Sequence, residues 1–86
     1  MSNFVIFNEW GTTSEEVLTR QFPLHKASRD GNAEELTNLL QTKQNSVFEE
    51  DSFYGWTPAH WAAYFGKVNC LVILEFIIFL LNINFA

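Results

Sequence analysis

Residues 55–66 read Gly55-Trp56-Thr57-Pro58-Ala59-His60-Trp61-Ala62-Ala63-Tyr64-Phe65-Gly66, and this stretch decides the fold of the chain. It predicts a short helix that begins after Thr57 and ends at Gly66. Thr57 can accept a hydrogen bond from an otherwise unpaired backbone N–H, and Pro58 suits the first helical position, where its missing N–H costs little. Gly66 can adopt the left-handed conformation that commonly ends a helix. The small side chains of Ala62 and Ala63 would let another helix approach closely.

An earlier stretch has the same layout and reads Phe22-Pro23-Leu24-His25-Lys26-Ala27-Ser28-Arg29-Asp30-Gly31. Six pairs of identical residues are each separated by 35 positions, namely Pro23 and Pro58, His25 and His60, Ala27 and Ala62, Gly31 and Gly66, Leu36 and Leu71, and Leu39 and Leu74. One Pro-x-His would be a weak signal, but six matches at a single offset indicate an internal repeat.

A Thr-Pro-x-His-x-Ala-Ala pattern that recurs about every 33 residues is the signature of ankyrin repeats. The chain resembles the ankyrin-repeat family from about Phe22 to Leu74. The first copy departs from the family pattern at Phe22, where threonine is usual, and at Ser28, where a second alanine is usual. The second copy has Ala59 in place of leucine. The resemblance implies an all-α stack of helix-turn-helix units and a non-enzymatic role in binding other proteins.

The composition restricts the classes of function. A chain of 86 residues forms at most one small domain. Its net charge of −5 and its five scattered Lys and Arg residues argue against a nucleic-acid partner, which needs clustered basic residues. Cys70 is the single cysteine, so no intrachain disulfide can form. We therefore expect a reducing intracellular setting, in the cytoplasm or the nucleus.

We expect five segments along the chain. Residues 1–13 lack a helical period and are predicted to be a disordered or extended leader. Residues 14–21 are predicted to form an N-terminal capping helix that shields one apolar face of the stack. Residues 22–54 would form the first repeat with its connecting finger, and residues 55–75 a partial second repeat. Residues 76–86 form an apolar tail that has no resemblance to the repeat.

Within the first repeat, the pattern predicts helices over Pro23–Asp30 and Ala33–Thr42, followed by an extended finger over residues 43–55. Asn32 is a plausible N-cap for the second helix, because Glu35 follows it at the capping-box spacing. Asp51 lies four residues before Gly55, one more than is usual in the family, which suggests an inserted residue. The core-facing stripe of the second helix would consist of Leu36, Leu39 and Leu40.

The repeat pattern fails after Leu74, because Glu75 stands where the first copy has Leu40. This change suggests a truncated product. The apolar tail could cap the second repeat, or remain exposed and support self-association. A membrane role is disfavoured, since Leu71–Leu81 is far shorter than the roughly 20 residues of a membrane span. With fewer than the roughly three repeats that a stable stack needs, we predict marginal stability, and an unstable product without folded function is an alternative.

No catalytic group, metal site or cofactor site is predicted. His25 and His60 occupy equivalent repeat positions, and the resemblance implies that each imidazole bridges the start of its helix to neighbouring loop backbone. Cys70 is expected to be buried in a helix. The residues assigned to the structural repeat motif are Pro23, Leu24, His25, Ala27, Gly31, Gly55, Thr57, Pro58, His60, Ala62, Ala63 and Gly66.

The resemblance also indicates where partners would bind, because in ankyrin repeats the finger tip and the end of the first helix vary between proteins. The candidate partner-binding residues at these positions are Arg29, Asp30, Phe53, Tyr54, Trp56, Tyr64 and Phe65. Five of them are aromatic, and aromatic residues often dominate binding energy. The alternative is that some of these rings pack internally, as expected for Trp61. The sequence does not name the protein partner.

Overall fold

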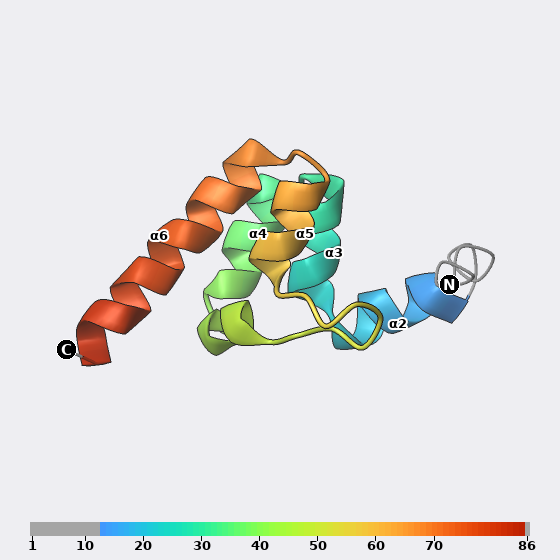
Figure 1. Cartoon of the computed structure of the whole chain (residues 1–86), viewed down its shortest axis with the longest axis horizontal. Helices are drawn as coiled ribbons and strands as arrows, with labels where there is room; N and C mark the ends of the chain where they lie inside the picture. The colour runs from blue at the N-terminus through green and yellow to red at the C-terminus, as the bar shows by residue number, and fades with distance from the viewer. Residues whose placement is uncertain (1–12, 86) are drawn as a thin grey trace.

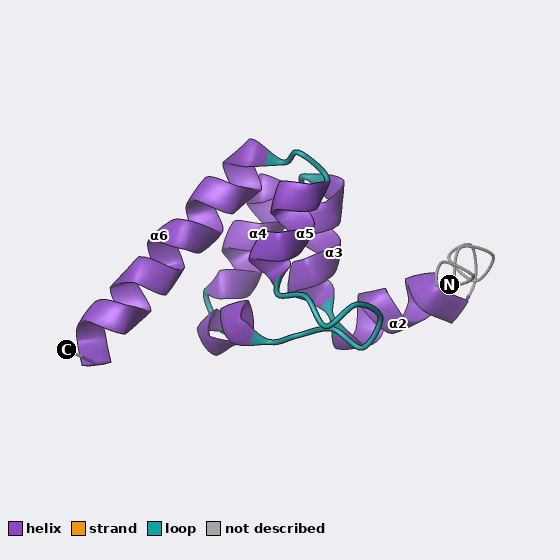
Figure 2. Cartoon of the chain, in the orientation of Figure 1, coloured by secondary structure: helices purple, strands orange, loops and turns teal. Residues whose placement is uncertain are grey.

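The structure is a computed structural model that describes residues 13–85 of the chain (Figure 1). It is all-helical, as predicted, and no strand occurs in the described part (Figure 2). The elements are α2 (Thr13–Gln21), α3 (Pro23–Asp30), α4 (Ala33–Leu40), the 3-10 helix η2 (Gln44–Phe48), α5 (Pro58–Tyr64) and α6 (Val68–Phe85). The leader predicted over residues 1–13 lies outside the described residues except for Thr13, which begins α2.

The helices form two stacked helix-turn-helix units. The first unit is α3 with α4, and the second is α5 with α6. Helix α5 packs against α3, while α6 packs beside α5 and α4 and also contacts η2. Helix α2 contacts α3 at the end of the stack remote from α6 (Figure 1). This order is the one expected for successive repeats preceded by an extra helix.

Helix α5 has the start and the stop that the sequence predicts. The Thr57 hydroxyl accepts from the backbone N–H of His60, and the His60 ring accepts in return from the backbone N–H of Thr57. This is a capping box in which a histidine takes the place of the usual Glu or Gln. Gly66 has a φ of 69°, a left-handed conformation that glycine adopts without strain.

Helix α3 explains both departures of the first copy from the family pattern. Phe22 precedes Pro23 without making a side-chain cap; instead its ring is buried and lies edge-on to the ring of His25, with a centroid distance of 5.2 Å. Ser28 is fully buried, and its hydroxyl donates to the carbonyl of Leu24 at 2.8 Å. The hydroxyl that serine carries and alanine lacks is therefore satisfied within the same helix.

Helix α4 is shorter than expected and the finger is not wholly extended. The Asn32 side chain accepts from the backbone N–H of Glu35, so the predicted cap is confirmed. The helix ends at Leu40 rather than Thr42. The prediction of an extended finger over residues 43–55 is wrong at its start, because η2 forms there and places Val47 in the core.

Helix α6 continues through the point where the repeat pattern fails. No break occurs between Leu74 and Phe76, and residues of the apolar tail up to Phe85 are helical. Cys70 and Leu74 are fully buried against the first unit, so the burial predicted for Cys70 is confirmed, whereas Glu75 is exposed. No helix in the described part of the chain is long and apolar enough to cross a membrane.

The buried side chains form two clusters. The larger cluster lies between the two units and is formed by Leu24, Ala27, Leu36, Leu40, Val47, Ala62, Cys70 and Leu74. The smaller cluster joins α2 to the finger and α5, and its buried members are Leu18, Phe22 and Trp61. Ala62 allows the close approach that was predicted, but Ala63 is exposed, and Ala59 packs on the larger cluster instead.

Candidate functional site

The finger is organised around the carboxylate of Asp51, which is almost fully buried. Its Oδ1 accepts from the backbone N–H groups of Phe53 and Tyr54, both at 2.6 Å, and of Gly55 at 3.3 Å. Its Oδ2 accepts from the backbone N–H of Trp56 and from the indole Nε1–H of Trp61. One side chain thus holds the turn that carries the aromatic residues and ties this turn to α5.

This role of Asp51 was not predicted from the sequence, where the residue served only as a marker of spacing. The available signal was an aspartate followed by an aromatic turn that contains glycine. Aspartate side chains commonly accept from the backbone N–H two residues later, and the contact from Asp51 to Phe53 is such an Asx turn.

A ladder of aromatic rings runs from the finger along α5. The ring centroids of Tyr54 and Trp56 are 4.7 Å apart, and those of Trp56 and Tyr64 are 5.3 Å apart. The imidazole of His60 stacks on the Trp56 indole with a centroid distance of 6.0 Å. The Phe65 ring stacks on that of Trp61 at 5.8 Å. These distances fall within the range of favourable aromatic pairs, so the rings support one another.

The five aromatic candidates differ in how far they face the solvent. Phe53, Tyr54 and Trp56 are half-buried and pack on the smaller core cluster. Tyr64 is 67% exposed and Phe65 is 39% exposed, so these two present the largest accessible part of the ladder. The alternative of internal packing therefore applies to the three finger residues.

Arg29 and Asp30 belong to a network of charged side chains. The guanidinium of Arg29 donates to both carboxylate oxygens of Glu15, each at 2.9 Å, and its Nε donates to Asp30 at 2.9 Å. Lys26 also pairs with Asp30, at 3.3 Å. The hydrogen bonds from Arg29 lower the pKa of the Glu15 carboxyl. Because Glu15 lies on α2, the network fastens α2 to α3, a connection that the sequence did not predict.

His25 performs the structural task that was expected of it. Its Nε2 lies 2.9 Å from the carbonyl oxygen of Glu49 and 3.0 Å from that of Trp56, so this nitrogen carries the proton and donates. The ring is fully buried, and Nδ1 has no hydrogen-bond partner among the described residues. Burial lowers the pKa of the imidazole. A neutral imidazole therefore joins α3 to the two backbone segments at the base of the finger, one at Glu49 and the other at Trp56.

His60 does not repeat this task, so the equivalence predicted for the two histidines is wrong. Its ring is exposed, and within residues 13–85 the hydrogen bonds of its Nδ1 go to Thr57. The reason is topological, since the chain after α5 continues into α6 and no described loop returns to His60.

The described residues contain no grouping of three or more His, Cys, Asp or Glu side chains that could hold a metal ion. The thiol of Cys70 points to the carbonyl of Ala27 at 3.9 Å, and burial raises its pKa, which favours the unreactive protonated form.

Comparison with known proteins identifies the family of the chain. Residues 3–83 match the family model described as Ankyrin repeats (3 copies). The chain belongs to the ankyrin-repeat family. The match continues beyond the change of pattern at Leu74 and includes most of the apolar tail. Ankyrin repeats generally mediate protein–protein interactions and are generally non-enzymatic.

The chain is also similar to curated ankyrin-repeat proteins. Ankyrin repeat and SOCS box protein 2 of Homo sapiens is 42% identical over 53 residues, which cover 62% of this chain and 8% of that protein. The protein of the same name from Bos taurus is 30% identical over 70 residues, which cover 81% of this chain and 11% of that protein. The chain thus spans about a tenth of the length of these relatives. No solved structure matches it.

Proposed function

We propose that this ankyrin-repeat chain binds a protein partner through the aromatic ladder of the finger and α5, with Tyr64 at its centre. The observation that carries the proposal is that the exposed Tyr64 ring rests on Trp56, which is itself held by the Asp51 carboxylate. An exposed aromatic ring that is already fixed loses little conformational freedom on binding, so more of its contact energy becomes affinity.

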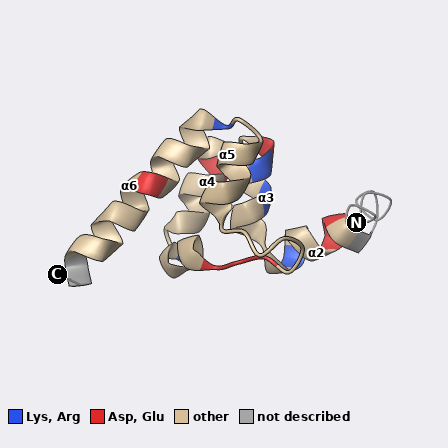
Figure 3. Cartoon of the chain, viewed as in Figure 1, with Lys and Arg blue, Asp and Glu red and all other residues tan. Residues whose placement is uncertain are grey.

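The charges around the ladder favour a basic partner segment. Glu49 and Glu50 are exposed and immediately precede Asp51, and acidic residues follow one another along this part of the finger (Figure 3). An Arg or Lys side chain of the partner can lie over the face of Trp56 or Tyr64 while its charge is balanced by these carboxylates. The net charge of −5 would also speed the approach of a basic partner.

The remaining candidates lie around this centre. Arg29 and Asp30 hold the same positions at the end of α3 that Tyr64 and Phe65 hold at the end of α5, one repeat later. We propose that Phe65 and Asp30 contact the partner at the rim of the surface. Arg29, Phe53 and Tyr54 would contribute chiefly by holding the surface in place.

A display experiment tests the proposal and does not require the partner to be identified first. Random dodecapeptides are selected against the full chain, and the affinities of the selected peptides are measured by calorimetry. We expect enrichment of Arg and Lys, and a loss of affinity of about tenfold or more for Tyr64→Ala, since a hot-spot side chain contributes about 2 kcal/mol. The control is Phe48→Ala, which removes an exposed ring outside the ladder. Peptides that bind the wild type and Tyr64→Ala equally would contradict the proposal.

Two further proposals concern context. We propose an intracellular location, in the cytoplasm or the nucleus, supported by the single buried cysteine. The sequences of Arg20–His25 and Asp51–Pro58 further resemble the start of ankyrin repeat domain-containing protein 10. We propose a relationship to that protein on these residues alone.

A further inference from the structure

Helix α6 is apolar on two opposite sides. Its inner side packs on the core through Cys70 and Leu74. On its outer side, Val72, Phe76 and Phe79 are each 60% exposed and Ile83 is 49% exposed. We call these four residues the α6 seam. In a monomer, a helix on the surface normally turns a polar side to the solvent, so the seam requires an explanation.

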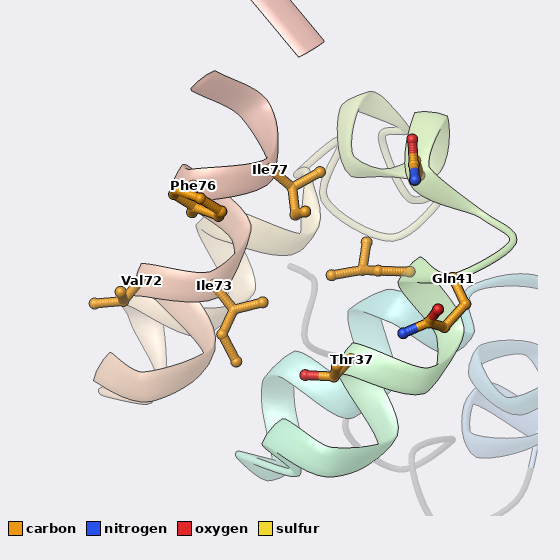
Figure 4. Close-up of a pocket in the computed structure, with 8 residues that line it drawn as sticks. Thr37, Gln41, Val72, Ile73, Phe76 and Ile77 are labelled. Carbon is orange, nitrogen blue, oxygen red and sulfur yellow. The ribbon is translucent and has the colours of Figure 1, made fainter. Parts of the chain in front are cut away.

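The arrangement around α6 shows that the first unit does not cover the seam. A groove of about 470 Å³ separates α6 from α4 and η2. Ile73 and Ile77 point into this groove toward α4 (Figure 4). The seam residues Val72 and Phe76 lie at its margin, where each stays 60% exposed, and Val72 points away from it. The seam therefore faces outward, on the side of α6 remote from its own core.

We propose that a second copy of this chain covers the seam, with the two α6 helices packed antiparallel. The seam residues are spaced by four, three and four positions, which is the a/d spacing of a coiled coil. This spacing reads the same in both directions along the helix, as a two-fold interface between identical chains requires. In the centred register, Phe76 of one copy meets Phe79 of the other, and Val72 meets Ile83.

The exposed area is sufficient for a dimer of this kind. The seam and its flanking residues Val68 and Leu80, which are 65% and 40% exposed, together present on the order of 600 Å² per copy. Two copies would then bury about 1,200 Å², the lower end of the range for specific interfaces. The interface thus suffices for a dimer that dissociates on dilution.

The charges of α6 favour a second copy over a membrane surface. Glu75 is the single charged residue of the helix (Figure 3), and it directly precedes the seam residue Phe76 in the sequence. In the centred register its carboxylate lies across from the Asn82 amide of the second copy, which can donate to it. A helix without Lys or Arg on a chain of charge −5 lacks the attraction to anionic headgroups on which interfacial helices rely.

Sedimentation velocity of the full chain over a range of concentrations tests the proposal. We expect a saturating rise to twice the 10.0 kDa mass of one chain. Phe79→Lys and, separately, Val72→Lys should each raise the dimer dissociation constant at least 100-fold while far-UV circular dichroism confirms an unchanged helix content. Tyr64→Lys places the same charge on the aromatic ladder and should dimerise like the wild type. Failure of the dimer proposal can therefore be distinguished from failure of the proposed binding function.

Disulfide trapping tests the orientation of the two helices. In a Cys70→Ala background, a mixture of Val72→Cys and Ile83→Cys chains should form a mixed disulfide dimer. Val72→Cys alone should not cross-link, because the two copies of residue 72 would lie about 16 Å apart along the helix axis, beyond the reach of a disulfide. The proposal would be overturned if Val72→Cys alone cross-linked. It would also be overturned if the chain stayed a monomer at every concentration, if its mass kept rising with concentration beyond a dimer, or if the monomer bound to phosphatidylcholine–phosphatidylserine vesicles.

Discussion

The indole N–H of Trp61 donates to the carboxylate of Asp51 inside the core, ten residues away in the sequence. This hydrogen bond connects the first helix of the second repeat to the turn of the finger. It is charge-assisted and buried, which makes it stronger than an ordinary side-chain hydrogen bond. The aromatic ladder on the surface therefore depends on a contact that is not itself accessible.

Replacing Asp51 tests this dependence. Asp51→Asn keeps the size of the side chain but turns an amide N–H₂ toward the N–H groups of Trp56 or Trp61, leaving buried donors unpaired. We expect a loss of about 2–3 kcal/mol in the free energy of unfolding, measured by urea denaturation followed by tryptophan fluorescence. Glu50→Gln is the matched control, because Glu50 is exposed, and it should stay within about 0.5 kcal/mol of the wild type.

His25 predicts a dependence of stability on pH. Because burial lowers its pKa in the folded state, the unfolded chain binds the proton more readily. Stability is therefore present above the ordinary value of 6.5 and is lost as the pH falls below it, by at most about 1.4 kcal/mol per pH unit. Denaturation curves at pH 7.5, 6.5 and 5.5 measure the effect.

The control for this pH dependence is His25→Gln, in which an amide can still donate to the carbonyl of Glu49 or Trp56 but does not titrate. The loss between pH 6.5 and 5.5 should disappear in this variant. An equal loss in the variant and the wild type would assign the effect to other groups.

The pair of Glu15 and Arg29 predicts a stabilisation that depends on salt. Glu15→Gln should lower the free energy of unfolding by about 0.5–1 kcal/mol at low ionic strength, because the pair is bidentate but partly exposed. The difference should shrink in 1 M NaCl, where charges are screened. Glu16→Gln is the neighbouring control and should have no effect. Since the Glu15 pKa is lowered, the stabilisation is present above the ordinary pKa of 4.5 and is lost as the pH falls through the folded value.

Trp56 and Tyr64 are adjacent rings with different expected effects on stability. Trp56→Ala should lower the melting temperature, because its half-buried ring packs on the smaller core cluster. Tyr64→Ala should leave the melting temperature nearly unchanged, because its ring is mostly exposed. Differential scanning fluorimetry compares the two directly. Equal destabilisation would show that Tyr64 is part of the packing and would remove the basis for using it as a binding probe.

The stability of the whole chain is the broadest prediction. Two stacked units and α2 bury few apolar faces compared with a longer ankyrin stack, so we expect a melting midpoint below about 60 °C by circular dichroism. A cooperative transition well above that temperature would show that α6 closes the stack more effectively than the repeat count suggests. The melt should be run at several concentrations, because a dimer through α6 raises the midpoint as the concentration rises.

The sequence by itself determined the local structure. Caps, proline at the first helical position and left-handed glycines act within a few residues, so Thr57, Asn32 and Gly66 could be assigned from spacing alone. The 35-residue offset indicated an internal repeat, and the resemblance to ankyrin repeats implied that the two units stack. The seven candidate binding residues also came from that resemblance, although their different exposures did not.

Only the tertiary structure decided which of those residues are accessible. In the folded chain Arg29 pairs with Glu15, Trp56 packs on the smaller core cluster, and Tyr64 faces the solvent. The tertiary structure also gave the two histidines at equivalent repeat positions different tasks, because within residues 13–85 a finger folds over His25 and none folds over His60. The physical reason is that exposure and long-range hydrogen bonds depend on which distant segments meet. Which segments meet follows from the packing of whole helices, and the local sequence pattern around a residue carries no information about that packing.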